Sequence, residues 1–277
     1  MTDNSGREGG GMGHQQCAGK KQEPEVLSPH ADSAINRVYA VMSGKGGVGK
    51  SLVTGLLAVA LRRRGYQVGI LDGDITGPSI PKMFGLDVKP VGLENGLFPV
   101  RTRGGIKVMS LNLLLPHEDD PVIWRGPILS GAVRQFWTDV IWGRVDFLLI
   151  DLPPGTGDVP LTVMQSIPLN GLVVVTLPQD LSALIVRKAV KMAMALNRPV
   201  VGVVENMAYA VCPRCGEEVR PFGDSHSRQI TGRTPAPLLA RLPLDPRLAM
   251  WSDTGGLESC DDGLLAKLEP LVEKICG

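Results

Sequence analysis

The chain has 277 residues, of which 43% are hydrophobic and 21% charged, and its formal net charge is +1. These proportions are typical of a globular protein with a buried core, and the near-neutral charge gives no support for a broad surface that binds nucleic acid or anionic membranes. No apolar run approaches the ~18 residues of a membrane span, and the N-terminus lacks the apolar stretch of a secretory signal. We therefore expect a cytoplasmic protein with neither nucleic acid nor a membrane among its partners.

The first 33 residues differ in composition from the rest. Residues 1–33 are rich in Gly, Gln, Ser and charged side chains and contain almost no bulky apolar residues. Such a segment buries too little surface to offset the entropy that is lost on ordering. We predict a flexible tail over residues 1–33, followed by one globular domain over residues 34–277.

Beyond the tail, short apolar runs alternate with helical patterns. Strands are predicted over residues 37–43, 67–71, 145–150, 171–177 and 199–204, and helices over residues 50–64, 182–196 and 264–275 and after Pro127. Apolar runs without polar alternation are typical of strands that are covered on both faces. Residues 91–110 contain two glycine turns and predict a small inserted hairpin. The pattern predicts an α/β fold, a doubly wound and mostly parallel sheet flanked by helices, with ligands bound beyond the carboxyl ends of the strands.

A glycine-rich loop lies between the first predicted strand and the first predicted helix. It has the spacing G-x-x-x-x-G-K-S and comprises Gly44, Lys45, Gly46, Gly47, Val48, Gly49, Lys50 and Ser51. Glycines let backbone N–H groups converge on phosphate oxygens, and a helix N-terminus favours their negative charge. In such a loop Lys50 would contact the β- and γ-phosphates and Ser51 would ligate Mg²⁺. The loop predicts a P-loop nucleotide hydrolase that uses ATP, with GTP as the alternative.

Two further predicted strands end in carboxylates. Asp151 follows an apolar strand, at the position where P-loop enzymes hold Mg²⁺ through water. Asp72 and Asp74 follow the second strand, where a carboxylate can orient the attacking water, and we predict that Asp74 has this catalytic role. The alternative for each residue is that it only caps a loop.

The five cysteines direct attention to metal or redox chemistry, because an odd number in a cytoplasmic chain argues against a disulfide framework. Cys212 and Cys215 form a C-x-x-C step, which supplies half of the ligands of a zinc ion or a cubane cluster. Three interpretations stay open: two pairs that meet in a homodimer around one [4Fe–4S] cluster, zinc with two further ligands, or a redox dithiol. Cys17, Cys260 and Cys276 are isolated, and we assign no metal to them.

Several motifs occur together and in a specific order. They are the second lysine of the loop, Lys45, then Asp72-x-Asp74-x-x-Gly-Pro-Ser, then Asp151-Leu-Pro-Pro-Gly-Thr-Gly-Asp158, then Glu205-Asn206-Met207, and then the C-x-x-C step. In this combination, over residues 37 to 260, the chain resembles the Mrp/Nbp35-type branch of the deviant Walker A ATPases. Wider relatives of that branch include MinD, ParA and the nitrogenase iron protein.

The resemblance implies a homodimer that carries a [4Fe–4S] cluster and transfers it to apo iron–sulfur proteins in an ATP-dependent manner. It implies that Lys45 reaches the nucleotide of the partner subunit and shares catalysis with Lys50 and Asp74. It also implies that Asn206, at the end of a strand, contacts the adenine, and that Asp245 lies in a second segment that contacts the base.

Two alternative functions are compatible with the phosphate loop. The first is a positioning ATPase of the MinD/ParA kind, which cycles on membrane or DNA. The predicted C-terminal helix over residues 264–275 has balanced charge and a proline, whereas a membrane-positioning protein would need a basic amphipathic helix. The second alternative is a zinc-stabilised P-loop ATPase whose client is not a cluster. Only the carrier and the zinc protein account for Cys212 and Cys215.

Overall fold

The computed structural model describes residues 1, 26–74, 79–115, 126–223 and 236–277, without the side chains of residues 126 and 180–185. Seven parallel strands form the centre of this part of the chain, in the spatial order β6-β2-β7-β1-β8-β9-β11. Their bounds are Ala34–Ser43 (β1), Val68–Asp72 (β2), Lys107–Ser110 (β6), Arg144–Asp151 (β7), Gly171–Thr176 (β8), Val200–Val211 (β9) and Leu238–Pro243 (β11). The predicted parallel sheet is confirmed.

Two short antiparallel strands extend this sheet, and a hairpin lies outside it. β5 (Val100–Arg101) pairs with β6, and β10 (Glu218–Val219) pairs with the last residues of β9. The predicted hairpin consists of β3 (Val91–Leu93) and β4 (Gly96–Phe98), which form a separate two-stranded sheet.

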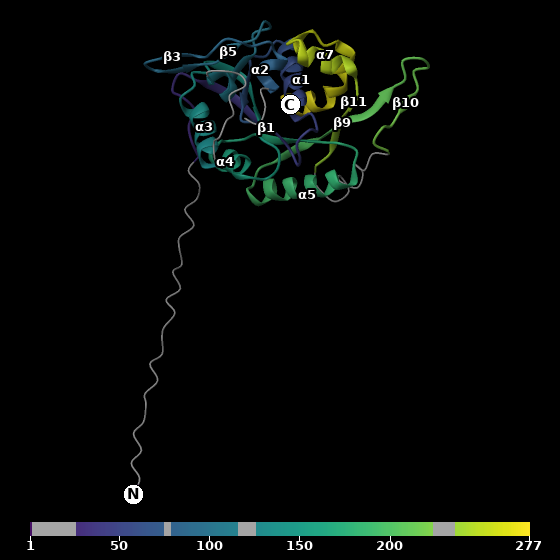
Figure 1. Ribbon diagram of the computed structural model, residues 1–277. Coiled ribbons are helices and arrows are strands. Elements are labelled where there is room, and N and C mark those ends of the chain that lie inside the picture. The colour runs from purple at the N-terminus through teal and green to yellow at the C-terminus, as the bar shows by residue number, and fades with distance from the viewer. Residues whose placement is uncertain (2–25, 75–78, 116–125, 224–235) are drawn as a thin grey trace.

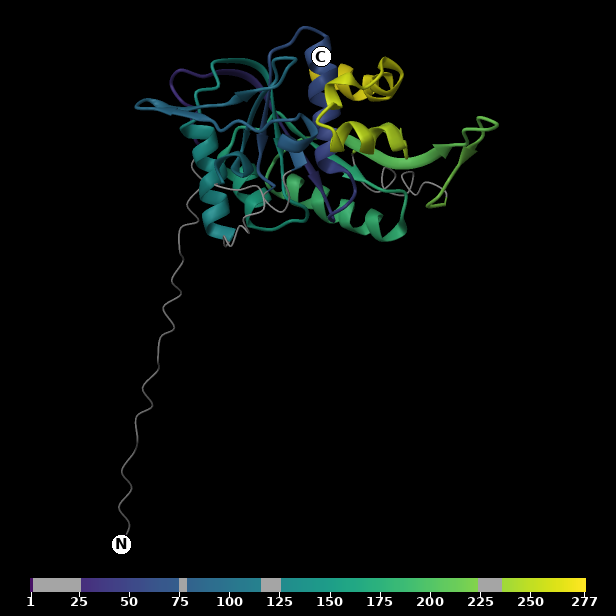
Figure 2. The ribbon, with the colours of Figure 1, turned by 45° about the horizontal axis from the view of Figure 1, so that its top comes forward.

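Helices cover both faces of the sheet (Figures 1 and 2). One face carries α1 (Lys50–Arg63), α2 (Ser79–Met83), α7 (Pro246–Asp253), α8 (Asp262–Leu265) and α9 (Glu269–Cys276), with the 3₁₀ turns η2 (Leu257–Ser259) and η3 (Ala266–Leu268). The other face carries α3 (Gly126–Thr138), α4 (Asp158–Ser166) and α5 (Asp180–Ala195). The 3₁₀ turn η1 (Leu111–Leu114) follows β6. No helix among the described residues is long and apolar enough to span a bilayer.

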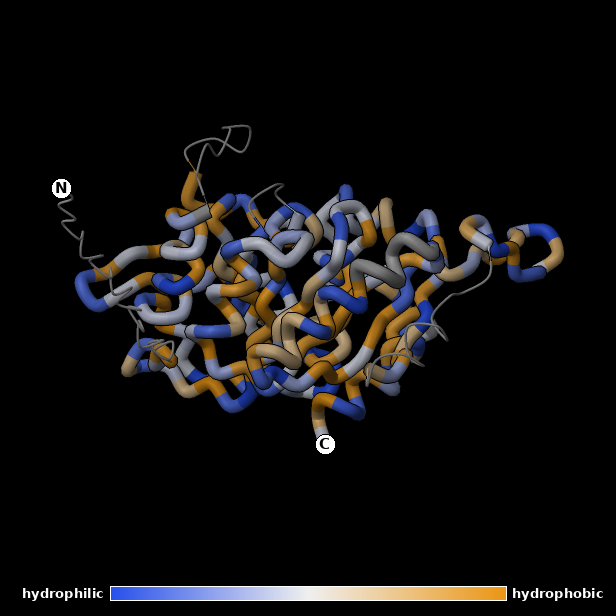
Figure 3. The backbone as a smooth tube through the Cα atoms, turned by 90° about the horizontal axis from the view of Figure 1, so that it is seen from below, coloured by the Kyte–Doolittle hydropathy of each residue, from blue (hydrophilic) through white to orange (hydrophobic). Residues whose placement is uncertain are grey.

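Strand β7 shows why its sequence is almost continuously apolar. Phe147 and Leu149 pack into the core under α1, whereas Leu148 and Ile150 pack into the core under α3 to α5. Successive side chains of a strand point to opposite faces, so a strand that is covered on both sides needs apolar residues at every position. Figure 3 shows the result, with hydrophobic segments through the middle of the molecule and hydrophilic ones along its periphery.

Two expectations about the ends of elements are wrong. The predicted helix over residues 264–275 is broken into α8, η3 and α9, with Pro270 in the first turn of α9. Proline has no N–H to continue the preceding helical hydrogen bonds, so the helix has to begin again there. The predicted strand over residues 199–204 continues to Val211, so Asn206 lies inside β9 rather than at its end.

Residues 26–33, which the composition assigned to the tail, contact the domain. The backbone N–H of Leu27 donates to the carbonyl of Ser166 at 2.8 Å, and the indole of Trp137 donates to the carbonyl of Leu27 at 3.0 Å. A ring nitrogen of His30 lies 2.8 Å from the carbonyl oxygen of Asn95 in the β3–β4 turn. The earlier residues of the predicted tail, together with Cys17, lie outside the described part of the chain.

Candidate nucleotide site and cysteine pair

The phosphate loop connects β1 to α1, as its sequence predicts. Gly47 and Gly49 have φ angles of 77° and 78°, in the left-handed region that favours glycine. Gly49 is the N-cap of α1 and has no side chain with which to cap it. The N–H groups of the first helical turn have no partners within the helix, so this end of α1 is available to a phosphate.

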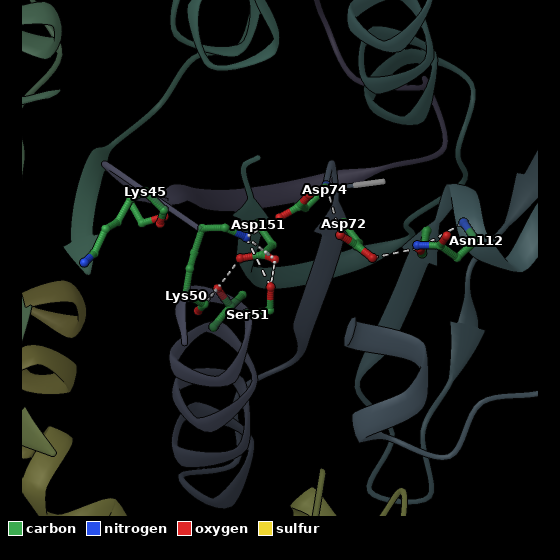
Figure 4. A network of polar contacts seen from close by, with 10 residues as sticks. Lys45, Lys50, Ser51, Asp72, Asp74, Asn112 and Asp151 are labelled. Carbon is green, nitrogen blue, oxygen red and sulfur yellow. Dashed lines mark hydrogen bonds and ion pairs between the residues drawn. The ribbon is translucent and has the colours of Figure 1, made fainter. Parts of the chain in front are cut away.

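The side chains of Lys50 and Ser51 converge on the carboxylate of Asp151 (Figure 4), and Thr54 contacts the same group. The ammonium of Lys50 lies 2.7 Å from Oδ2 of Asp151, the hydroxyl of Ser51 donates to the same oxygen at 2.5 Å, and Thr54 donates to Oδ1 at 2.8 Å. Lys50 also forms an ion pair with Asp74 at 3.2 Å. The structure therefore brings together four residues that the sequence predicted separately, Lys50, Ser51, Asp74 and Asp151, and a fifth, Thr54, that it missed. Thr54 could have been inferred because it lies one helical turn after Lys50.

Burial and charge have opposite effects on Lys50. Its side chain is 5% exposed and that of Asp151 is fully buried. Burial alone would lower the pKa of Lys50, but the carboxylates of Asp151 and Asp74 outweigh it and raise the pKa above its usual value. Lys50 is therefore a cation at neutral pH, as phosphate binding requires. The adjacent oxygens of Ser51 and Asp151 are the donors that Mg²⁺ prefers, so these residues fit the ion.

A cavity of about 440 Å³ opens at this end of α1. It is lined by residues 46–52 of the loop, Asp74, Lys82 of α2, Pro154 and Asp253 of α7. The volume is in the range of small-molecule sites, and two lysines, Lys50 and Lys82, line it. The cavity suits a phosphorylated ligand.

Lys45 lies in the same loop but does not join this cluster. Figure 4 shows its side chain directed away from Lys50, Ser51 and Asp151, and its ammonium donates to Oε1 of Gln179 at 2.7 Å. The second lysine of the loop therefore faces outward from the site of its own chain.

Asn206 of β9 forms a hydrogen bond with the backbone of the phosphate loop. It is 1% exposed, and its Nδ2 donates to the carbonyl of Val48 at 2.9 Å. A Cβ on Gly49 would lie 2.2 Å from that nitrogen, so the loop and Asn206 fit together only with glycine there. The Oδ1 atom of Asn206 is buried and has no hydrogen-bond partner among the described residues. Buried polar atoms are normally paired, so this unpaired acceptor is an exception.

Asp245 has a structural role that is visible in the fold. Its Oδ1 accepts the backbone N–H of Arg247 at 2.9 Å and so caps α7, and its Oδ2 pairs with the Arg247 guanidinium at 2.6 Å. The side-chain hydrogen bond from Arg247 lowers the pKa of Asp245. Its predicted contact with a base stays a prediction.

Asp72 is a buried carboxylate that the sequence placed at the end of a strand without assigning it a role. It is 2% exposed and lies beside Asp151 in the parallel register of β2 and β7. Burial and the charge of Asp151 raise the pKa of Asp72 to about 8, although the Ser110 hydroxyl and the charge of Lys50 oppose this rise.

The cysteine pair lies at the tip of the β9–β10 ribbon, which projects from the domain in both ribbon views (Figures 1 and 2). The N–H of Cys212 donates to the carbonyl of Glu217 and the N–H of Gly216 to that of Cys212, each at 2.9 Å. Cys212 is half-buried, Cys215 is exposed, and both thiols are free. Backbone N–H groups of Cys215 and Arg214 lower the pKa of Cys212, which favours the thiolate that binds metals.

The described part of one chain does not complete a metal site around this pair. No three His, Cys, Asp or Glu side chains group together there in a way that could hold a metal ion. Cys260 is buried in the core, where desolvation raises its pKa, and Cys276 is partly buried in α9. Two thiolates are half of the ligands that a tetrahedral metal ion or a cubane cluster needs, so the described residues of one chain do not suffice for either.

Comparisons with known proteins show the family of this chain. Residues 34–275 match the ParA family described as NUBPL iron-transfer P-loop NTPases. A protein of Methanococcus maripaludis named iron-sulfur cluster carrier protein is 50% identical over 225 residues, which cover 80% of this chain and 78% of that one. A protein of the same name from Clostridium perfringens is 48% identical over 232 residues, 81% of each chain.

Solved structures show the same architecture. A nucleotide-binding protein from Archaeoglobus fulgidus in complex with ADP has a TM-score of 0.73 and 48% identity, and the match covers 81% of this chain and 88% of that one. The MinC:MinD complex from Aquifex aeolicus has a TM-score of 0.65 at 17% identity, over 87% of this chain and 96% of that one. At such low identity the second likeness is one of fold alone.

Proposed function

The chain belongs to the NUBPL iron-transfer family of P-loop NTPases, and on this basis we propose that it is an ATP-dependent carrier of a [4Fe–4S] cluster. It binds ATP with Mg²⁺, hydrolyses it, and delivers the cluster to apo iron–sulfur proteins. The observation that carries the proposal is the occurrence, in one chain, of a phosphate site and of a pair of free thiols, one half-buried and one exposed, that supplies only half of the ligands of a cluster.

The buried environment of Asn206 supports ATP over GTP. Its Nδ2 is used by the carbonyl of Val48, so the unpaired atom that remains is the acceptor Oδ1. Adenine presents an amino donor at the position where guanine presents a carbonyl acceptor. An adenine amino group can therefore satisfy Oδ1, whereas the guanine carbonyl would leave it unpaired, at a cost of about 1–3 kcal/mol.

The nucleotide site has the residues for hydrolysis. Lys50 neutralises phosphate charge, Ser51 and Asp151 would hold Mg²⁺, and the ion would neutralise charge that develops on the phosphate oxygens. Asp74, at the rim of the same cavity and within reach of Lys50, orients the attacking water. Lys45, which faces outward, contributes its charge to the nucleotide of a second chain.

The cluster is the cargo of this carrier. Cys212 and Cys215 of one chain and the same pair of a second chain supply four thiolates to one [4Fe–4S] cluster at the axis of a homodimer. Asn206 lies in β9 and Cys212 directly follows it. A movement of Asn206 on nucleotide binding or hydrolysis can therefore be transmitted along this strand to the cluster site. Such a movement would alter the geometry of the dimer and hence the affinity of the four cysteines for the cluster.

Anaerobic reconstitution with iron and sulfide tests the proposal. We expect the wild-type chain to acquire cluster absorbance, one cluster for two chains by native mass spectrometry, and Cys212→Ser and Cys215→Ser to lose it. Cys276→Ser is the matched control, because it removes a partly buried thiol outside the ribbon. Cluster binding by both ribbon variants would refute the site, and zinc without iron or sulfide in the purified wild-type protein would favour the zinc-stabilised ATPase.

A further inference from the structure

The carboxyl group of Asp72 connects three elements at the carboxyl end of the sheet. Asp72 is the last residue of β2, and it lies between Ser110 of β6 and Asp151 of β7 in the parallel register. Its Oδ2 accepts the hydroxyl proton of Ser110 at 2.7 Å, and its Oδ1 accepts the backbone N–H of Asp74 at 3.1 Å. One buried side chain thus ties the end of β6 to the backbone of Asp74.

The Ser110 hydroxyl is itself contacted by a neighbouring residue, Asn112. The backbone N–H of Asn112 donates to Oγ of Ser110 at 3.2 Å, and its Nδ2 lies 3.4 Å from the same oxygen. The Ser110 hydroxyl therefore accepts from Asn112 and donates to Oδ2 of Asp72, as a hydroxyl with one hydrogen and two lone pairs can do. Figure 4 shows the resulting chain of contacts from Asn112 through Asp72 toward the phosphate site.

The loop that carries Asp74 has a second backbone attachment nearby. The N–H of Gly73 donates to the carbonyl of Asp151 at 2.9 Å. A Cβ on Gly73 would lie 3.2 Å from that carbonyl oxygen, so the loop is packed closely against the end of β7. The backbone N–H of Asp74 is thus bound by the side chain of Asp72, and that of Gly73 by the backbone of β7. In this arrangement the carboxylate of Asp74 faces Lys50.

We propose that Asp72 is a positioning residue for ATP hydrolysis, which acts by fixing the backbone of Asp74 and is itself held by Ser110 and Asn112. The inference rests on the proposed function, because the role of Asp74 is to orient the attacking water. Displacement of a reacting group by ~1 Å can cost a factor of ~100 in rate, whereas the binding of phosphate to Lys50 and the loop does not need Asp74 to be in place. Loss of Asp72 or Ser110 should therefore lower the turnover number and leave the affinity for nucleotide nearly unchanged.

Steady-state ATP hydrolysis by the full chain with Mg²⁺ tests the proposal, together with ADP titration calorimetry to count competent sites. For Ser110→Ala and for Asp72→Asn we expect kcat to fall by about tenfold or more, with KM, ADP affinity and stoichiometry within about twofold of the wild type. The double variant should be no slower than the slower single variant, because both changes interrupt one path. A fall in kcat caused by misfolding would appear instead as a loss of ADP stoichiometry.

Ser130→Ala is the matched control. Ser130 is a buried serine in α3 whose hydroxyl has no hydrogen-bond partner among the described residues, so the change removes the same atom without touching this chain of contacts. It should keep the wild-type kcat. As a second measurement, exchange of the Asp74 amide proton, followed by NMR, should accelerate in Ser110→Ala and not in Ser130→Ala.

The outcomes separate the two proposals. Absence of ATP hydrolysis in the wild-type protein would refute the hydrolytic function and this role with it. Hydrolysis that depends on Asp74 but is unaffected by Ser110→Ala and Asp72→Asn would refute the positioning role alone, as would an unchanged Asp74 amide exchange rate. Equal losses of kcat and ADP binding would mean that Asp72 supports the whole site and does not position Asp74.

Discussion

The ammonium of Lys50 lies 2.7 Å from a carboxylate oxygen of Asp151, and the two side chains are 5% and 0% exposed. A buried ion pair of this kind depends on both members, because removal of one leaves an uncompensated charge in a medium of low polarity. The pair thus links the stability of the domain to Lys50, the residue that we propose contacts the phosphates.

Lys50→Met should reduce both stability and nucleotide binding. We expect a loss of about 3 kcal/mol in the free energy of unfolding, at the lower end for a broken buried pair because Ser51 and Thr54 still donate to Asp151. Urea unfolding and ADP titration measure the two effects. Lys50→Met combined with Asp151→Asn should recover most of the stability but no binding, and Lys188→Met, an exposed change on α5, should alter neither. Wild-type affinity in Lys50→Met would contradict the role of this residue.

Two loop glycines should respond differently to alanine. Gly47 has positive φ but open space around it, whereas a Cβ on Gly49 would also lie 2.2 Å from Nδ2 of Asn206. Gly47→Ala should therefore cost about 1–2 kcal/mol of backbone strain. Gly49→Ala should cost more and should also displace Asn206 and weaken ADP binding by at least about tenfold, since a 1.4 kcal/mol change corresponds to that factor. Thermal unfolding and calorimetry compare them, and equal effects of the two changes would show that the contact with Asn206 is unimportant.

Lys45→Met should lose hydrolysis and keep ADP binding, because the ammonium of Lys45 contacts Gln179 and faces away from the site of its own chain. A cation supplied in trans contributes at least about 10³ in rate in related chemistry, so a loss of two or more orders of magnitude is expected. The test is a mixture of Lys45→Met and Lys50→Met chains. Activity should reappear in the mixture, since the Lys45→Met subunit receives the missing lysine from its partner, and a mixture that stays inactive would place the action of Lys45 within one chain.

Cys212 should be alkylated faster than Cys260 in the metal-free protein. Backbone N–H groups of Cys215 and then Arg214 lower the pKa of Cys212, whereas burial raises the pKa of Cys260. The thiolate is the reactive form, so at pH 7.5 iodoacetamide should modify Cys212 at least about tenfold faster. Mass spectrometry after timed quenching measures both sites. The pH at which the Cys212 rate is half-maximal should lie below the value of a free cysteine, and a profile at or above that value would be evidence against the hydrogen bonds in the ribbon.

Asp72 should make the nucleotide-free protein less stable as the pH rises. Its folded pKa of about 8 is above the ordinary value of 3.8, so between these values the folded chain binds more protons than the unfolded chain. The contribution to stability is complete below pH 3.8 and is lost as the pH passes through 8. In urea unfolding with a chelator present, the wild type should lose more stability between pH 5 and pH 8 than Asp72→Asn. Parallel curves for the two proteins would contradict the raised pKa.

The sequence by itself determined the class of fold and the phosphate site, because both depend on local order along the chain. Continuous apolar runs require strands with two covered faces, and the loop spacing places its glycines, Lys50 and Ser51 at one helix N-terminus whatever surrounds them. The hydrophobic periodicity does not show where a proline interrupts a helix, as the break before Pro270 demonstrates.

Only the tertiary structure decided which side chains meet. Asp72, Ser110 and Asp151 come from three strands that are adjacent in space and far apart in sequence, so neither their contacts nor the raised pKa of Asp72 follows from a motif. The same holds for Asn206, whose fit against Gly49 depends on β9 lying beside the loop. The outward direction of Lys45 depends on Gln179, the N-cap of α5. Pairing of distant strands determines these relationships, and it depends on the packing of the whole core rather than on any single segment.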